Sequence, residues 1–313
     1  MGFVPLKGKT FTPWNGCFLL CIAIFLSHAI PAHSAEIAIL KSQDLRPYNE
    51  TIKAFIRQAD TDVDQYDMEG DMEKGNRIAA TIIASHPKLI VAIGTKASMA
   101  VSQATSTIPV VSLLVSRPEI YLQGRKNVVG ISLNPDPRDQ LKLLKKLYPK
   151  AQKIGVVYDG GNQSQALKDG KRLIREEYQL VEEVVSSESE TPAAVRSLMG
   201  KVDVLWLVMD EKVVSEQSLP YITTVSMESR LPIIGFAKSI VKSGALFSTV
   251  TEFDDIWRQG ADLATRILDG ADPAKISFIY PHPSGYVLNL RSAKLMDMLI
   301  PASIIKNAKE VYE

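Results

Sequence analysis

Short apolar runs alternate with segments of helical spacing along most of the chain. Residues 204–208, 232–235 and 245–248 form three such runs, and between them apolar residues such as Leu219 and Ile222 recur at helical spacing. Strands of a parallel sheet that is covered by helices on both faces have continuous apolar sequences rather than alternating ones. The pattern therefore predicts an α/β fold with parallel sheets.

The alternation of strand and helix occurs in two successive series, which predicts two doubly wound parallel-sheet lobes. Strands are expected over residues 36–40, 88–93, 109–115, 128–132, 153–158, 180–185 and 276–280, and a helix over 292–299, besides the runs named above. Strand–helix–strand units of this kind favour right-handed crossover connections. We expect lobe 1 to contain residues 36–118 and 250–280, and lobe 2 to contain residues 119–249 and 281–313, with a hinge that crosses between the lobes more than once.

The first 35 residues differ from the rest of the chain. Lys7 and Lys9 precede an apolar run over residues 17–26, which a polar segment rich in small residues follows. This order is typical of a secretory signal peptide, and the run is too short to cross a bilayer of about 30 Å as a helix. We expect cleavage after Ser34 or Ala35 and a periplasmic or secreted mature protein; the alternative is an uncleaved membrane anchor.

Composition argues against several classes of function. Both cysteines, Cys17 and Cys21, lie in the expected signal peptide, and the formal net charge of the chain is +1, which gives no sign of a nucleic-acid partner. His86 and His282 are the histidines of the expected mature chain, and neither a nucleophile elbow nor a dinucleotide fingerprint occurs in the sequence. We expect no catalytic residues, no metal site and no cofactor.

Polar or aromatic residues follow several of the predicted strands. Open α/β sheets bind ligands in the crevice at the carboxyl ends of their strands. The candidate ligand contacts chosen by this rule are Ser42, Thr95, Lys96, Ser116, Tyr158, Asp210, Phe236 and Thr251.

Two of these positions suggest how charge would be recognised. Gly94 and Thr95 end a strand at a helix start, where free N–H groups favour an anion; the alternative is a glycine turn with Thr95 as the helix cap. Asp210 could pair with an ammonium group or could be a helix cap without ligand contact. Tyr158 and Phe236 could form an aromatic wall or belong to the core.

An acidic run between Asp60 and Glu73 has some features of a calcium loop. The sixth position of that loop requires glycine for its sharp turn, and Gln65 is found there. We expect a solvated strand edge and helix start instead.

Several segments, taken in order, resemble the periplasmic substrate-binding proteins of ABC transporters, in the branch that includes tryptophan- and tyrosine-type binding components. They are residues 90–97 (IVAIGTKA), 108–111 (IPVV), 128–132 (VVGIS), 153–158 (KIGVVY), 231–245 (LPIIGFAKSIVKSGA) and the final 28 residues, with Asn289, Ala293, Pro301 and Ala308 at recurring positions. One departure is Ser116-Arg117-Pro118, where the family commonly has an acidic residue before the proline.

The resemblance implies a type 1 periplasmic binding fold that closes on a small organic solute, amino acid-like and possibly aromatic. It also implies a membrane permease of an ABC uptake system as the partner, and we expect the protein to be a monomer. A ligand-sensing module for a membrane receptor would need the same cleft and is the first alternative; an exported α/β enzyme is the second.

Overall fold

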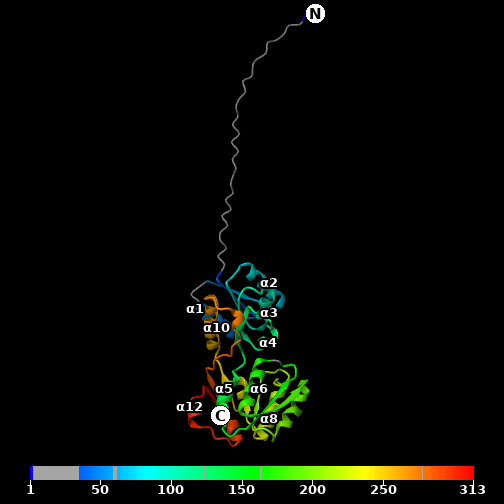
Figure 1. Ribbon diagram of the computed structural model, residues 1–313, viewed down its shortest axis with the longest axis vertical. Coiled ribbons are helices and arrows are strands. Elements are labelled where there is room, and N and C mark those ends of the chain that lie inside the picture. The colour runs from blue at the N-terminus through cyan, green and yellow to red at the C-terminus, as the bar shows by residue number, and fades with distance from the viewer. Residues whose placement is uncertain (3–34, 59–61, 123, 163, 277) are drawn as a thin grey trace. The chain divides into compact units, whose positions relative to one another are not determined.

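The computed structural model in Figure 1 describes residues 1–2, 35–58, 62–122, 124–162, 164–276 and 278–313. The expected signal peptide, with Cys17, Cys21 and Ser34, lies outside the described residues. The architecture below is that of the unit Ser34–Glu313. Among the helices described there, none has both the length and the apolar character that crossing a membrane requires.

The first sheet has five parallel strands in the order β2-β1-β3-β4-β5. They are β1 (Ile37–Lys41), β2 (Val63–Asp67), β3 (Leu89–Ile93), β4 (Val110–Val115) and β5 (Val128–Ser132). The helices that accompany this sheet are α1 (Arg46–Gln58), α2 (Met72–Ala84), α3 (Thr95–Ala104), α4 (Pro118–Tyr121) and α10 (Phe253–Leu268).

Helices cover both faces of the first sheet, which explains why its inner strands β1, β3 and β4 are mainly apolar. Side chains of β3 alternate between the faces: Val91 packs with α1 and α10, whereas Ile90 packs with α2 and α3. The rings of Phe55 on α1 and Trp257 on α10 lie 5.8 Å apart between centroids, so these two helices form one layer although they are distant in sequence.

The second sheet has seven strands in the order β12-β11-β10-β9-β8-β6-β7. Its strands are β6 (Lys153–Asp159), β7 (Gln179–Val185), β8 (Val204–Trp206), β9 (Ile233–Ile234), β10 (Phe247–Val250), β11 (Gly285–Asn289) and β12 (Glu310–Tyr312). The helices in this part are α5 (Pro137–Leu147), α6 (Gln165–Glu177), α7 (Thr191–Leu198), α8 (Ser218–Glu228), α9 (Lys238–Lys242), α11 (Leu290–Leu295) and α12 (Ala302–Lys306). Short 3-10 turns occur at Glu188–Glu190 and Pro273–Lys275. Every pairing in this sheet is parallel except that of β10 with β11.

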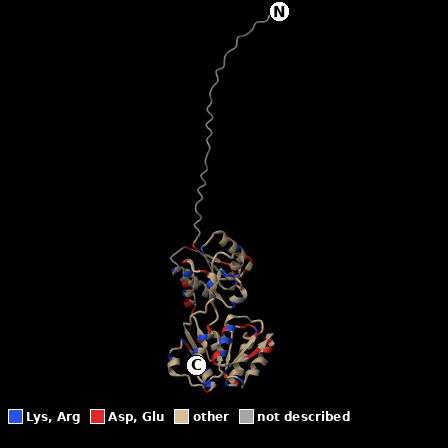
Figure 2. Cartoon of the chain, viewed as in Figure 1, with Lys and Arg blue, Asp and Glu red and all other residues tan. Residues whose placement is uncertain are grey.

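The chain passes between the two sheets three times. The first crossing leads from β5 to α5, the second leads from β10 to α10, and the third leads from the segment after α10 back to β11. Two parallel-sheet α/β lobes joined by a hinge with several crossings confirm the predicted fold class. Figure 2 shows basic and acidic residues interspersed along the chain in both lobes.

Three predicted boundaries differ from the structure. The strand at residues 128–132 pairs with β4 in the first sheet, whereas the predicted boundary at residue 118 assigned it to lobe 2, because Pro118 begins the short helix α4 rather than a linker between lobes. Of the strand expected over residues 276–280, the described residues form a single bridge, between Ile131 and Ile279. The helix expected over residues 292–299 begins and ends earlier, as α11.

The described part of the acidic run, from Asp62 to Glu73, is part of ordinary secondary structure. Asp67 closes β2 and accepts a hydrogen bond from the backbone of Glu69, and Asp71 caps α2 by accepting from the N–H groups of Glu73 and Lys74. These local bonds occupy carboxylates that a calcium loop would use as ligands.

Candidate ligand-binding site

The carboxyl ends of β1 and β3 bring Ser42, Thr95 and Lys96 together. Gly94 joins β3 to α3 with φ 87° and ψ 163°, a conformation that is essentially restricted to glycine. A Cβ atom on Gly94 would lie 2.6 Å from the hydroxyl oxygens of Ser42 and Tyr48, so the close approach also requires glycine. Burial raises the pKa of the Tyr48 hydroxyl, which is therefore neutral and available as a hydrogen-bond donor.

The side chains of Ser42 and Lys96 form hydrogen bonds with different parts of the first sheet's surroundings. Ser42 is only 5% exposed, and its Oγ accepts a hydrogen bond of 3.0 Å from the backbone N–H of Ala97 in the first turn of α3. The ammonium group of Lys96 donates to the carbonyl of Gly70 at 2.6 Å, which directs it to the loop after β2. Gly94, not Thr95, occupies the N-cap position of α3, so the alternative in which Thr95 caps the helix is wrong.

Ser116 follows β4 at a distorted part of the first sheet. Leu114 is buried with φ 58°, and the pairing of β4 with β5 shifts register beside it. A non-glycine residue in this region costs about 1–3 kcal/mol and persists only where the surroundings impose it. The carbonyl of Ser116 accepts a hydrogen bond of 2.6 Å from the amide of Asn134, which connects the end of β4 with the first crossing.

Charged side chains follow Ser116 and β8. The guanidinium of Arg117 lies 5.9 Å from the ring centroid of Tyr121 and 3.6 Å from the carboxylate of Glu211. Lys212 pairs with Asp159 at 2.9 Å, and this hydrogen bond is the main reason why the pKa of Asp159 is lowered. Both signs of charge are therefore present at the strand ends.

Asp210 lies at the end of the apolar run that contains β8 and is buried. One of its carboxylate oxygens accepts hydrogen bonds from the backbone N–H of Asp159 (2.9 Å) and the amide of Asn162 (2.8 Å). The other oxygen accepts from the backbone N–H of Lys212 at 3.1 Å. The carboxylate thus joins the ends of β6 and β8, and contact with a ligand ammonium stays a prediction.

Tyr158 does not form the aromatic wall that its position at a strand end suggested. Its hydroxyl donates to Glu182 on β7 and accepts from Lys171 on α6, each at 2.8 Å. The Lys171 ammonium also lies 4.4 Å from the centroid of the ring. Because successive side chains of a strand point to opposite faces, Tyr158 faces α6 rather than the crevice at the strand ends.

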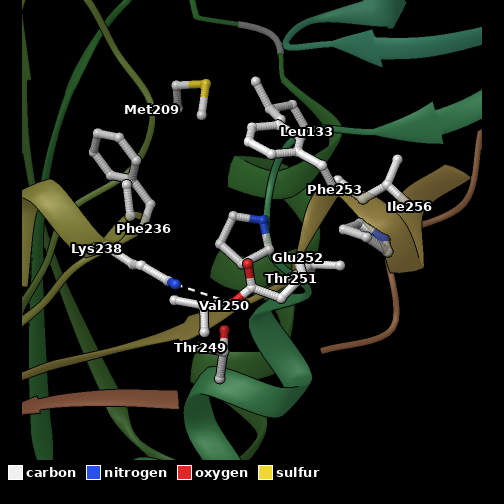
Figure 3. A pocket seen from close by; sticks show the side chains of 13 residues that line it. Leu133, Met209, Phe236, Lys238, Thr249, Val250, Thr251, Glu252, Phe253 and Ile256 are labelled. Carbon is white, nitrogen blue, oxygen red and sulfur yellow. Dashed lines mark hydrogen bonds and ion pairs between the residues drawn. The ribbon is translucent and has the colours of Figure 1, made fainter. Parts of the chain in front are cut away.

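A cavity of about 300 Å³ lies at the carboxyl ends of β9 and β10 and reaches the first turn of α10 (Figure 3). Of the predicted contacts, Phe236 and Thr251 line it. Its other apolar lining includes Leu133, Met209, Phe253 and Ile256. This volume is at the lower end of the range of small-molecule sites, which are mostly apolar with a few placed polar groups.

The charged groups of this cavity are Lys238 and Glu252. The Lys238 ammonium lies 2.9 Å from the Glu252 carboxylate, as the dashed line in Figure 3 shows, and Lys309 lies 3.4 Å from the same oxygen. The hydrogen bond from Lys238 is the main cause that lowers the pKa of Glu252, so this group is a carboxylate at neutral pH. One ammonium and one carboxylate therefore stand beside an apolar cavity, a pattern that matches a zwitterion with an apolar side chain.

Sequence reasoning missed most of this lining. Lys238 and Glu252 could have been found by the rule that gave Phe236 and Thr251, because each lies one or two residues further along the chain. Leu133 comes from the first crossing and Phe253 from the start of α10. No local signal distinguishes such apolar residues from core residues.

Comparison with known proteins now decides the family. Residues 53–312 match the sequence profile of the family described as ABC transporter substrate binding protein. The chain belongs to this family. A "Tyrosine-binding protein" of Clostridioides difficile (strain R20291) is 30% identical over 247 residues, which cover 75% of this chain and 70% of the relative.

Two solved structures have the same fold. One is the ligand-free, open structure of a substrate binding protein with adhesive properties from Clostridium difficile, with a TM-score of 0.70 and 23% identity. The other is an ABC domain in complex with L-Trp from Streptococcus pneumonia, with a TM-score of 0.59 and 23% identity. Each alignment covers 89% of this chain and 99% of the other. At this identity the likeness shows the fold, which is the type 1 periplasmic binding fold.

Proposed function

We propose that this protein is the solute-binding component of an ABC uptake system and that it captures an amino acid with an apolar, aromatic side chain. The observation that carries this proposal is the cavity at β9 and β10, which combines an apolar lining with one ammonium and one carboxylate. The names of the relatives, one tyrosine-binding and one in complex with L-Trp, support the same class of ligand.

Each part of the ligand has a partner of suitable chemistry. The side chain of the amino acid would pack against Phe236, Met209 and Leu133, since aromatic and apolar surfaces attract through burial. The α-carboxylate would pair with Lys238 and the α-ammonium with Glu252, so the ligand would replace the ion pair that these residues form with each other. Thr95 and Ser116 would contribute from the first sheet when the hinge closes.

Isothermal titration with L-tyrosine and L-tryptophan tests the ligand class. Phe236→Ala should weaken binding about tenfold to a hundredfold, because a buried phenylalanine side chain contributes about 1.5–3 kcal/mol. Phe278→Ala is a matched control, since this phenylalanine does not line the same cavity. Absence of binding by both amino acids, or equal affinities of the Phe236→Ala variant and the wild type, would contradict the proposal.

Uptake requires export and a membrane permease. We expect the mature chain to begin at Ala35 or Glu36, as the charged, apolar and small-residue parts of the first 35 residues indicate. Mass analysis of the exported protein checks this expectation, and an intact Met1 in the exported fraction would contradict it. Delivery to a permease predicts that cells lacking the protein lose high-affinity uptake of the amino acid that titration identifies.

A further inference from the structure

A second and larger cavity, of about 530 Å³, lies against the crossings between the two sheets. Its walls come from α4 and the residues after it, from β5 and the start of the first crossing, from the third crossing and from α6. None of the residues that line this cavity also lines the first cavity.

The crossings separate the two cavities. Along the first crossing, Ser132 and Asn134 line the second cavity, whereas Leu133 and Pro135 line the first. This alternation is what a nearly extended chain produces, because successive side chains point to opposite sides. In the third crossing, Tyr280 lines the second cavity and Pro281 lines the first. The same backbone is therefore a common wall of both cavities.

The lining of the second cavity is amphipathic. Leu122, Val128 and Phe278 give it an apolar part. Gly130 is required there, because a Cβ atom at this position would lie 2.7 Å from the Phe278 ring and 1.9 Å from the carbonyl oxygen of Ser112. The absence of a side chain at Gly130 thus lets the ring pack closely on β5.

The two charged residues that line the second cavity, Asp169 and Arg125, do not form an ion pair with each other. Asp169 has a partner at each carboxylate oxygen: Tyr280 donates at 2.7 Å to one and Gln165 donates at 3.1 Å to the other. Arg125 lines the same cavity and is exposed, and within the part of the chain that the structure describes its side chain has neither an ion pair nor a hydrogen bond. An incoming ligand would therefore meet a free positive charge beside an apolar surface.

We propose that this cavity is a second ligand site, which takes an organic anion with an apolar body, such as an aromatic monocarboxylate. The carboxylate pairs with Arg125 in a bidentate manner and the apolar body lies on Phe278 and Leu122. No ammonium is needed on the ligand, because Asp169 already has its donors. This requirement distinguishes the second site from the zwitterion site proposed above, and the second site does not depend on that proposal.

Occupancy of the second site is linked to the arrangement of the lobes. Val128 belongs to the first sheet and Ala166 to α6, beside the second sheet, so a ligand in this cavity touches both lobes. A ligand that binds one arrangement of the lobes better than another shifts the population toward it. Because the crossings form the common wall, the anion and the amino acid should change each other's affinity by the same factor, typically about 5–150.

Titration of the full mature chain with indole-3-acetate tests the second site, since this probe has an aromatic body and a carboxylate but no ammonium. Arg125→Glu should weaken binding of the probe at least tenfold, because attraction is replaced by repulsion. Lys126→Glu makes the same charge change at the next residue, which is exposed and outside the cavity, and should leave the affinity within about twofold. Among the described residues the side chain of Arg125 has no ion pair and no hydrogen bond that the substitution would remove, so the variant is expected to fold.

Further variants show which cavity holds the probe. Phe236→Ala should leave binding of indole-3-acetate within about twofold, whereas Phe278→Ala should weaken it. Loss of probe binding in Phe236→Ala would place the probe in the first cavity and overturn the proposal. Equal effects of Arg125→Glu and Lys126→Glu, or no binding to the wild type up to about 10 mM, would overturn it as well.

Discussion

The carboxylate of Asp210 accepts hydrogen bonds from two backbone N–H groups and one side-chain amide, which belong to the last residue of β6 and to the loops after β6 and β8. Its side chain is buried and its acceptor sites are largely used. These hydrogen bonds hold the segments after β6 and β8 together, and a buried donor that loses its acceptor is costly.

Asp210→Asn should therefore reduce stability rather than act mainly on affinity. The amide nitrogen of asparagine would face one of the N–H donors, so the free energy of unfolding should fall by about 1–3 kcal/mol in urea titrations. Glu211→Gln, at a carboxylate with 88% of its side chain exposed, should stay within about 0.5 kcal/mol of the wild type. An unchanged unfolding curve together with lost amino-acid binding would instead make Asp210 a ligand contact.

Gly94 shows the effect of a single absent side chain at the start of α3. Gly94→Ala should destabilise the protein by more than about 2 kcal/mol, because the backbone conformation is unfavourable for alanine and its Cβ would collide with Ser42 and Tyr48. Gly200→Ala is the control: φ is also positive, at 71°, but nothing lies within 4 Å of the added Cβ, so only about 1 kcal/mol should be lost. Thermal unfolding of both variants checks the difference, and equal losses would show that the contact with Ser42 is unimportant.

The prediction of site residues from sequence was limited by side-chain direction. The position after a parallel strand places a residue at the correct end of the sheet, and this was sufficient for Phe236 and Thr251. It does not determine where a long side chain goes. Lys96 reaches back to the carbonyl of Gly70, and Tyr158 turns to Lys171 and Glu182, because each finds hydrogen-bond partners there.

At the scale of elements, continuous apolar runs predicted most of the strands, but they missed the more polar edge strands β2 and β12 and did not always indicate the correct sheet. The segment at residues 128–132 is a strand, as predicted, yet it pairs with β4 of the first sheet. The pairing of strands depends on non-local hydrogen bonds and register, which cannot be inferred from the local order of apolar and polar residues. The segment that contains Ile279 has strand-like composition, but it makes only one bridge, to Ile131.

The second crossing is held by an ion cluster that should make stability depend on pH. The folded state lowers the pKa of Glu252, mainly through the hydrogen bond from Lys238. A lowered carboxyl pKa stabilises the folded state above the ordinary pKa of glutamate, about 4.3, and this contribution is lost as the pH falls through the lower, folded value. The difference in stability between wild type and Glu252→Gln should therefore be largest near neutral pH and disappear in acid.

Urea unfolding from pH 7 to about pH 3 measures this dependence. The Glu252 side chain is 39% exposed, so screening should make the difference smaller in high salt. Glu228→Gln, at an exposed glutamate of α8, should follow the wild type over the whole range. A difference between wild type and Glu252→Gln that persists in acid would mean that shape, not charge, is responsible.

For the molecule as a whole, three crossings between two independently packed lobes allow movement about a hinge. A ligand can favour closure only by the additional contacts that it makes in the closed state. The proposed amino acid would supply them, since Phe236 and Lys238 belong to the second lobe and Phe253 to α10, which packs on the first sheet.

Binding of the amino acid should therefore compact the protein. Small-angle scattering at saturating L-tyrosine or L-tryptophan, whichever titration shows to bind, should give a smaller radius of gyration than scattering without ligand. At the same ligand concentration, the radius of gyration of Phe236→Ala should equal that of the unliganded protein, because the ligand no longer gains the contact with Phe236 that stabilises the closed state. Arg117→Ala, which removes the ion pair with Glu211, should alter the extent of closure only slightly, because the two charges are 3.6 Å apart and Glu211 is 88% exposed, and such pairs contribute about 0–1 kcal/mol. Unchanged scattering of the wild type at saturation would mean that the ligand binds without hinge closure, and its contacts would then have to come from one lobe alone.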